Sequence, residues 1–345
     1  MGETRMNTFA QRRRPGRVAA AVLTAALAFS LAACGGGSGD DKPASDASGK
    51  PAAADAGFPR TITHDKGTTE VKTKPKRVVA LDNSLVEAVV ALDAPLVGGI
   101  SSYRDQKGFP AYLGDAVKET KDVGPLDSPN LEAIAALKPD LIVSATVRHA
   151  DLYDQLSKIA PTVFVKTTGP IWKENVTFLG QALGQEEKAK AKLTAYETRA
   201  KKIGDAINAQ GGGSGDGGKP TVSVTRFVDG PTRIYLPKSF SGIILTDMGL
   251  LRPENQRDTV KFNIEISEEQ IQQVDADHIF LTAFSGGEER KKKFMANPLW
   301  QRLNAVQKGN VHEVDDATWM TSVSLQGADM VLDDMAKIFK VEPAK

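Results

Sequence analysis

Short apolar segments alternate with helical segments along most of this chain, and the alternation limits the folds that it can adopt. The run RVVAL at 77–81 is rich in β-branched residues and has polar flanks, as expected of a buried strand. Asp82, Asn83 or Ser84 can cap the helix that follows, and LVGGI at 96–100 is the next predicted strand. This order of strand, helix and strand predicts an α/β fold with a parallel sheet.

The same alternation continues in two regions that a long helical stretch separates. Strands are predicted at 141–145, at 162–166 and again at 221–227. Between them, apolar side chains recur at spacings of three and four, which predicts a helix with one buried stripe: Leu193, Tyr196, Ala200, Ile203 and Ile207. After Gly184 this helix could run for ~24 residues, or roughly 36 Å. The predicted fold is therefore two α/β lobes, each with a mostly parallel central sheet flanked by helices, joined by a single long α-helix.

The N-terminus carries a separate signal. An arginine-rich segment is followed by sixteen uncharged residues, 18–33, and then by Cys34. A positive segment, a short apolar segment and small residues before a cleavage site are typical of a secretory signal peptide, and the apolar run is short for a membrane span. The sequence LAACG at 31–35 resembles a bacterial lipobox, in which the cysteine becomes the lipidated N-terminus. We therefore expect Cys34 to anchor the protein to the outer face of the cell membrane.

The chain is expected to consist of five parts. The segment after Cys34 is rich in Gly, Ser, Ala, Asp and Pro and has no apolar periodicity, so it cannot bury enough surface to fold. The predicted parts are a signal peptide (1–33), a flexible tether (34–58), an N-terminal lobe (59–170), a bridging helix (171–210) and a C-terminal lobe (219–345).

Composition excludes several classes of protein. Cys34 is the only cysteine, so an intrachain disulfide and a cysteine-based zinc or iron–sulfur site are excluded. The formal net charge is +1, but residues 1–33 carry five Arg and one Glu, which leaves the rest of the chain at −3. Without a basic stripe the folded part is not expected to bind nucleic acid. We expect a monomer.

No catalytic motif is present in the sequence. It has no G-x-S-x-G segment, no phosphate-binding G-x-x-x-x-G-K-S/T segment, no H-E-x-x-H segment and no dinucleotide-binding glycine pattern after the first predicted strand. Acidic pairs such as Asp315-Asp316 are expected to be solvated. The histidines have no metal-ligand spacing and are expected to be structural: His64, His149, His278 and His312. These observations predict a binding protein without a cofactor, and not an enzyme.

Three segments carry a resemblance to a known family: KPKRVVALDNSLVEAVVALDAPLVGGISSY, DVGPLDSPNLEAIAALKPDLIVSA and NPLWQRLNAVQKGNVHEV. Together they resemble the substrate-binding lipoproteins of iron–siderophore ABC importers, which include binders of ferrichrome, ferrioxamine, ferric citrate and cobalamin. The resemblance implies a receptor that binds Fe(III) already enclosed by a siderophore and delivers it to an ABC permease. The expected ligand is a hydroxamate of the ferrioxamine type, and the protein itself supplies no ligand to the iron.

Candidate ligand-binding residues follow predicted strands. The planar guanidinium of Arg can bond to hydroxamate or carboxylate oxygens, and Tyr and Trp offer flat apolar surface with a polar group. The resemblance implies that Tyr103, Arg226 and Trp319 face the ligand. The full set of candidates is Tyr103, Arg104, Arg148, Arg226, Arg233, Tyr235 and Trp319. Trp172 and Trp300 are expected to be structural.

The resemblance also implies where the permease docks, because family members present one Glu on each lobe. In the N-terminal lobe the matching residue is Glu132, which is also placed to interact with the dipole of its own helix. In the C-terminal lobe the matching position holds Thr246, a departure from the family, and the adjacent Asp247 is the candidate instead.

Two other ligands are compatible with the same fold. A haem carrier would use Met and His as axial ligands, for which Met320 or Met248 with a histidine could serve. A cobalamin binder would rely on aromatic residues more than on Arg, and only 6% of this chain is aromatic.

Overall fold

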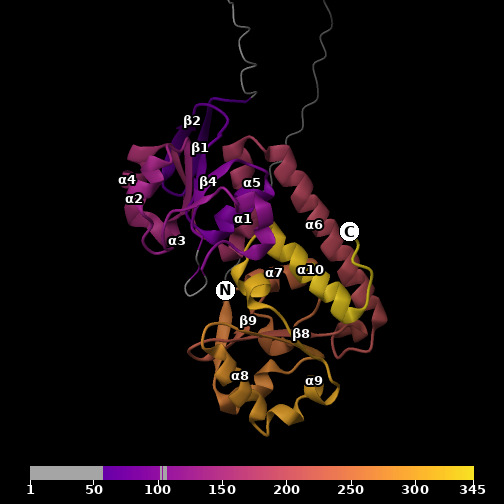
Figure 1. Cartoon of the computed structure of the whole chain (residues 1–345). Helices are drawn as coiled ribbons and strands as arrows, with labels where there is room; N and C mark the ends of the chain where they lie inside the picture. The colour runs from indigo at the N-terminus through magenta and orange to yellow at the C-terminus, as the bar shows by residue number, and fades with distance from the viewer. Residues whose placement is uncertain (1–56, 102, 104–106) are drawn as a thin grey trace, which may run out of the picture. The chain divides into compact units, whose positions relative to one another are not determined.

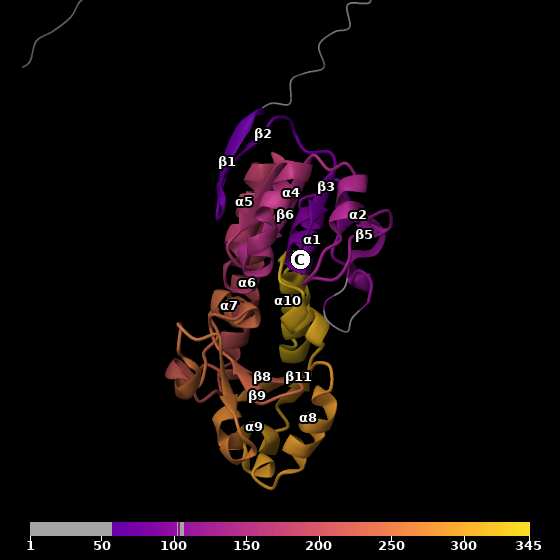
Figure 2. The same ribbon diagram turned by 90° about the vertical axis from the view of Figure 1, so that its left-hand side faces the viewer.

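The computed structural model describes residues 57–101, 103 and 107–345. The predicted signal peptide, Cys34, most of the tether and Arg104 lie outside the described residues. Figures 1 and 2 show the arrangement of the helices and strands. We use "N-lobe" for the described residues of 59–170 and "C-lobe" for 219–345. No helix in the described part is long and apolar enough to span a membrane.

The N-lobe is built on a parallel sheet with strand order β5-β4-β3-β6-β7. Its strands are β3 (Val78–Ala80), β4 (Leu96–Gly99), β5 (Lys121–Asp122), β6 (Leu141–Ala145) and β7 (Thr162–Val165). Successive side chains of β3, β6 and β7 alternate between two buried clusters, so both faces of the sheet are covered. The covering elements are α1 (Asn83–Ala91), η1 (Ala111–Val117), α2 (Leu131–Ala136), α3 (Thr146–His149), η2 (Ala150–Leu152) and α4 (Tyr153–Ile159).

A hairpin that the sequence did not predict precedes this sheet. It consists of β1 (Arg60–His64) and β2 (Gly67–Val71), which pair antiparallel. The hairpin is fixed to β7, since the Asp65 N–H donates to the Phe164 carbonyl at 3.0 Å and the Thr69 hydroxyl donates to the Thr162 carbonyl at 2.7 Å.

The C-lobe sheet has strand order β10-β9-β8-β11-β12 and is mixed. The pairs β8/β11 and β11/β12 are parallel, whereas β8/β9 and β9/β10 are antiparallel. The short turn after β8, in which Gly230 has φ +149°, permits only an antiparallel return. The strands are β8 (Val222–Phe227), β9 (Thr232–Tyr235), β10 (Asn263–Ile266), β11 (His278–Ala283) and β12 (Val311–Glu313).

Helices cover both faces of the second sheet (Figure 2). On one face Val222, Val224 and Phe280 join the cluster that contains α7 (Phe240–Asp247) and α10 (Leu325–Phe339). The opposite face packs on α8 (Gly287–Ala296), η7 (Trp300–Arg302) and α9 (Asn304–Gln307). Shorter turns complete the lobe: η4 (Asp216–Gly218), η5 (Glu254–Gln256), η6 (Glu268–Val274) and the π-helical η8 (Ala317–Thr321). At η6, Ser267 and Gln270 form a capping box.

Two helices occupy the predicted bridging region. After η3 (Gly169–Ile171), α5 (Trp172–Leu183) packs on α1, and α6 (Glu186–Gln210) continues to the C-lobe helices α7 and α10. Gly184 separates them with φ +64°, a left-handed conformation that favours glycine at a helix end. The long helix is therefore α6 alone, which has 25 residues. A methyl group at Gly204 would overlap the Met248 carbonyl, so glycine lets α6 approach the end of α7 closely.

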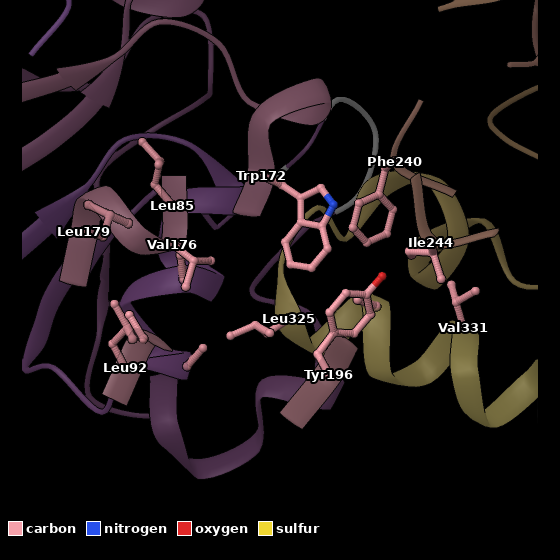
Figure 3. Packing of buried hydrophobic residues seen from close by; sticks show 14 of the residues in the cluster. Leu85, Leu92, Trp172, Val176, Leu179, Tyr196, Phe240, Ile244, Leu325 and Val331 are labelled. Atoms are coloured by element: carbon pink, nitrogen blue, oxygen red, sulfur yellow. The ribbon is translucent and has the colours of Figure 1, made fainter. Parts of the chain in front are cut away.

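One apolar cluster is shared by the two lobes and the bridging helices (Figure 3). The Trp172 ring of α5 packs edge-to-face against Tyr196 of α6 at 5.2 Å and Phe240 of α7 at 5.7 Å, measured between ring centroids. Leu325 of α10 belongs to the same cluster as Leu85 of α1. Trp172 and Trp300 are both buried core residues, as expected from the sequence. This common core joins the lobes by packing as well as by the chain.

Candidate ligand-binding site

A cavity of about 390 Å³ lies between the two lobes. On the N-lobe side it is bounded by segments that directly follow β3, β6 and β7, the carboxyl ends of parallel strands, where α/β proteins commonly bind ligands. The C-lobe contributes residues of β8 and β9 and the segments around Phe262 and Met320. Larger hollows exist, including one of about 840 Å³, but that one is lined by C-lobe residues alone and contains none of the predicted binding residues.

Arg148 enters the cavity from α3 and is held by Asp82. Its Nε donates to Asp82 Oδ2 at 2.9 Å. Asp82 caps α1, because its Oδ1 accepts from the Ser84 backbone N–H at 2.9 Å and from the Ser84 hydroxyl at 2.6 Å. Within the described part of the chain, Arg148 donates hydrogen bonds only through Nε. Its two terminal nitrogens are therefore available to a ligand.

Arg226 lies at the end of β8 and is fixed more tightly. Its Nε and Nη2 donate to the two oxygens of Asp316 at 2.7 and 2.6 Å, and its Nη1 donates to the Tyr235 hydroxyl at 3.3 Å. Burial lowers the pKa of Arg226, but its hydrogen bond to Asp316 and the charges around it raise the pKa above its ordinary value. Asp316 also accepts from the hydroxyls of Thr282 and Thr321.

Arg233 and Tyr235 reach the cavity from β9. Arg233 Nε donates to Glu265, its direct cross-strand partner on β10, at 3.2 Å. The Tyr235 ring packs edge-to-face on Phe262 at 5.4 Å. A methyl group at Gly169, in the segment after β7, would lie 3.7 Å from the Phe262 ring. Phe262 therefore approaches the opposite side of the cavity.

Tyr103 also lines the cavity, whereas Trp319 does not. The half-buried Tyr103 follows β4, and its ring lies 6.2 Å from the C-lobe residue Phe284.

The expectation that Trp319 faces the ligand is corrected by the structure, in which this side chain is fully buried. Its ring stacks on Phe280 at 4.9 Å and its Nε1 donates to Asp334 at 2.8 Å. The turn of η8 directs Trp319 into the core, while Met320 and Thr321 line the cavity.

The structure adds residues that sequence reasoning missed. Asp316 is only 7% exposed, so the expectation of a solvated acidic pair is wrong for this residue. Asp82 was identified as a helix cap but not as part of the site. Phe262 and Thr321 carry no sequence signal that would have placed them at the cavity, and Met320 was considered only as a possible haem ligand.

The charged residues that line the cavity have an excess of positive charge. They are Arg148, Arg226, Arg233 and Asp82. Asp316 and Glu265 balance two of the arginines from outside the lining. Counted with these partners the set is neutral, but the N–H groups of the three arginines that are not used by their partners suit a ligand with several oxygen acceptors.

Comparison with known proteins identifies the family. Residues 78–318 match the model of the periplasmic binding protein family. This chain belongs to that family. It is 38% identical over 293 residues, covering 81% of this chain and 87% of the relative, to the probable siderophore-binding lipoprotein YfiY of Bacillus subtilis. It is 33% identical to the achromobactin-binding periplasmic protein of Dickeya dadantii, covering 76% and 86% of the two chains.

A solved structure agrees with these relatives. The crystal structure of Staphylococcus aureus SirA complexed with staphyloferrin B has a TM-score of 0.75 and 33% identity to this periplasmic binding protein, covering 82% of this chain and 99% of that one. The resemblance drawn from the sequence is thereby confirmed, together with its α/β fold. The family and relatives are substrate-binding transport proteins, so this chain is a binding protein and not an enzyme.

The described residues of this periplasmic binding protein were compared with the arrangement that a bare metal ion requires. In the described part of the chain no three His, Cys, Asp or Glu side chains are placed to hold one. The described residues that line the cavity include Met320 but no histidine.

The two candidates for permease docking have different surroundings. Glu132 is exposed in the first turn of α2, where Asn130 caps the helix. Asp247 is engaged within the protein: its oxygens accept from Lys173 Nζ of α5 at 3.0 and 2.9 Å, and Oδ2 also accepts from the Tyr196 hydroxyl at 2.9 Å. Asp247 therefore links α7 to α5 and α6.

Proposed function

We propose that this protein binds a ferric siderophore in the cavity between its lobes and delivers it to an ABC permease. The observation that carries the proposal is the convergence of Arg148, Arg226 and Arg233 from both lobes on one cavity. A siderophore already satisfies the coordination of Fe(III), so the protein has to recognise the outer oxygens of the chelate, and arginine is suited to this. The names of the relatives, which include siderophore-binding and Fe(3+) dicitrate-binding proteins, support the same ligand class.

The arginine donors of the cavity favour a chelate with several carboxylate oxygens. Citrate complexes of Fe(III) carry several carboxylates, whose oxygens can accept hydrogen bonds from the N–H groups of Arg148, Arg226 and Arg233 that are not used by their own carboxylate partners. The Fe(3+) dicitrate-binding periplasmic protein FecB of Escherichia coli is 30% identical, covering 83% of this chain and 92% of its own. The ferrioxamine-type hydroxamate expected from the sequence rests on arginine alone, and arginine serves carboxylates equally well. We therefore place a carboxylate chelate first and the hydroxamate second.

We also propose the location and organisation that the sequence predicts. In this proposal a signal peptide (1–33) is removed, Cys34 is lipidated, and the tether holds the two lobes outside the cell membrane. Relatives named lipoproteins support it. Glu132 is the proposed permease contact of the N-lobe, and Asp247, with its internal partners, is the weaker candidate of the C-lobe. Loss of membrane association on Cys34→Ser, measured by cell fractionation, is the expected result.

A titration against a panel of ligands tests the function. Intrinsic tryptophan fluorescence would be followed with ferric dicitrate, ferrioxamine B, ferric enterobactin, haem and cobalamin, with iron-free citrate as the control. Saturable quenching by ferric dicitrate, and none by iron-free citrate, is expected. Saturable binding of haem or cobalamin alone would overturn the proposal.

A further inference from the structure

A buried carboxyl group joins the two lobes next to the cavity. Glu87, on α1 of the N-lobe, is only 1% exposed. Its Oε2 accepts from the hydroxyl of the C-lobe residue Ser322 at 2.5 Å, and its Oε1 accepts from the Tyr112 hydroxyl of η1 at 2.8 Å. Its backbone carbonyl accepts from Gln326 of α10 at 2.9 Å. Glu87 is thus held by two C-lobe residues and one N-lobe residue.

The carboxyl group of Glu87 has no cationic partner in the described part of the chain. Asp82, on its own helix, is the charged group that acts on it, and Asp315 acts on its neighbour Tyr112. Lys173 of α5, which packs on α1, is paired with Asp247. The pKa of Glu87 is raised to about 7: burial is the main cause, the charge of Asp82 adds to the rise, and the hydrogen bonds from Ser322 and Tyr112 oppose it.

The segments on both sides of this contact include residues that line the cavity. Ser322 follows Thr321, a lining residue whose hydroxyl donates at 3.2 Å to Asp316, the carboxylate that fixes Arg226. At the start of α1, Asp82 lines the cavity and holds Arg148. A movement that separates Glu87 from Ser322 therefore shifts the segments that position both arginines.

We propose that Glu87 and Ser322 form a proton-dependent latch between the lobes, so that the protein retains its chelate more strongly at acidic than at alkaline pH. This inference rests on the proposed function and concerns the regulation of the same site. When the lobes separate, water reaches Glu87 and its pKa returns toward its ordinary value of 4.5. The joined state then binds more protons than the separated state. Its advantage is complete below pH 4.5 and is lost as the pH rises through about 7.

Affinity measured against pH tests the latch. Calorimetric titration with ferric dicitrate would be carried out between pH 6 and 8 on the full chain, on Glu87→Gln and on Asp93→Asn. Glutamine is neutral throughout and keeps the shape of protonated Glu, whereas Asp93 is an exposed carboxyl beyond the end of the same helix. All three proteins are titrated with the same chelate. The difference between their changes in affinity is therefore free of the pH dependence of the chelate itself. The parent and Asp93→Asn should lose about tenfold more affinity over this range than Glu87→Gln. Parallel curves for all three would overturn the latch.

A second measurement needs no ligand and separates failure of the latch from failure of the proposed function. Spin labels at Lys158→Cys on α4 and Lys292→Cys on α8, both exposed, would report the distance between the lobes once Cys34 is replaced by Ser. From pH 6 to 8 the distance between the labels should increase, or its distribution should broaden, in the protein with Glu87 and stay constant in Glu87→Gln. A constant distance in both proteins would overturn the latch. If the distance responds but ferric dicitrate does not bind, the latch stands and the ligand assignment fails. Should Glu87→Gln not fold, Ser322→Ala, which removes the C-lobe donor, should separate the lobes at a lower pH than in the parent.

Discussion

Arg226 and Asp316 form a two-point ion pair on the C-lobe side of the cavity, with nitrogen–oxygen distances of 2.7 and 2.6 Å. The side chains are 11% and 7% exposed, so neither charge is well solvated. The pair fixes the guanidinium plane and leaves Nη1 directed at Tyr235. Arg226 is therefore both a stability element and part of the candidate site, and the two roles can be measured separately.

Replacing Arg226 by Ala should lower the free energy of unfolding by about 3 kcal/mol, because it leaves the Asp316 carboxylate buried without its counterion. Urea unfolding followed by circular dichroism gives this quantity. Arg233→Ala is the matched control, since its partner Glu265 is 51% exposed and such pairs contribute less than about 1 kcal/mol. Equal losses in the two variants would contradict the role given to Asp316.

Replacing Arg148 by Gln should weaken ferric dicitrate binding, and it should also lower the free energy of unfolding because it leaves the buried Asp82 carboxylate without its counterion, so affinity is compared under conditions where the variant is folded. Each hydrogen bond to a charged group contributes about 1.5–3 kcal/mol, so roughly a 10- to 100-fold loss of affinity is expected. Asp82 keeps its bonds to Ser84, and α1 therefore keeps its cap. Calorimetric titration measures the loss. Arg290→Gln, on the C-lobe surface outside the cavity, should bind as the parent does; an unchanged affinity for Arg148→Gln would exclude Arg148 from the site.

Replacing Trp319 by Phe separates a structural role from a ligand-binding one. The variant loses the bond from Nε1 to Asp334 and part of the stacking on Phe280. We expect the free energy of unfolding to fall by about 1–3 kcal/mol. Chelate affinity under conditions where the variant is folded should change less than threefold. A large loss of affinity in a stable variant would restore Trp319 to the binding site.

Periodicity and helix caps in the sequence were enough to predict the α/β elements and the long helix, because each is determined by nearby residues. Asp82 at the start of α1 and Gly184 at the end of α5 act in this way. The antiparallel pairing of β9 with β8 depends on a short turn after β8. The regular alternation of predicted strands and helices gave no indication of this turn.

The candidate site was partly predictable for a related reason. Arg148 and Arg226 were found because residues after parallel strands gather at one edge of a sheet. Asp316 was misjudged because its burial depends on Arg226, 90 residues away in the sequence. Trp319 was misplaced because one turn of π-helix decides which of three consecutive side chains faces the cavity. Glu87 gives no sequence signal, since its partners lie 25 and 235 residues away.

The stability of the C-lobe should depend on pH through a pair of histidines. His278 Nδ1 and His312 Nε2 lie 3.0 Å apart, the rings are stacked, and Phe339 packs on His278. The pKa of His278 is lowered to about 4, mainly by burial and in part by the neighbouring His312. The unfolded chain, with an ordinary histidine pKa of 6.5, then binds more protons than the folded one between pH 6.5 and 4.

Stability should therefore fall as the pH is lowered through this range. We expect His278 to account for about 1–2 kcal/mol of the loss, after allowance for its partial exposure to solvent. Urea unfolding of the parent and of His278→Phe at pH 7 and 5 measures this share, because phenylalanine keeps the ring but cannot be protonated. The variant should lose less stability on acidification than the parent. An identical loss in both proteins would assign the acid sensitivity to other groups, of which the buried His149 is the first to examine.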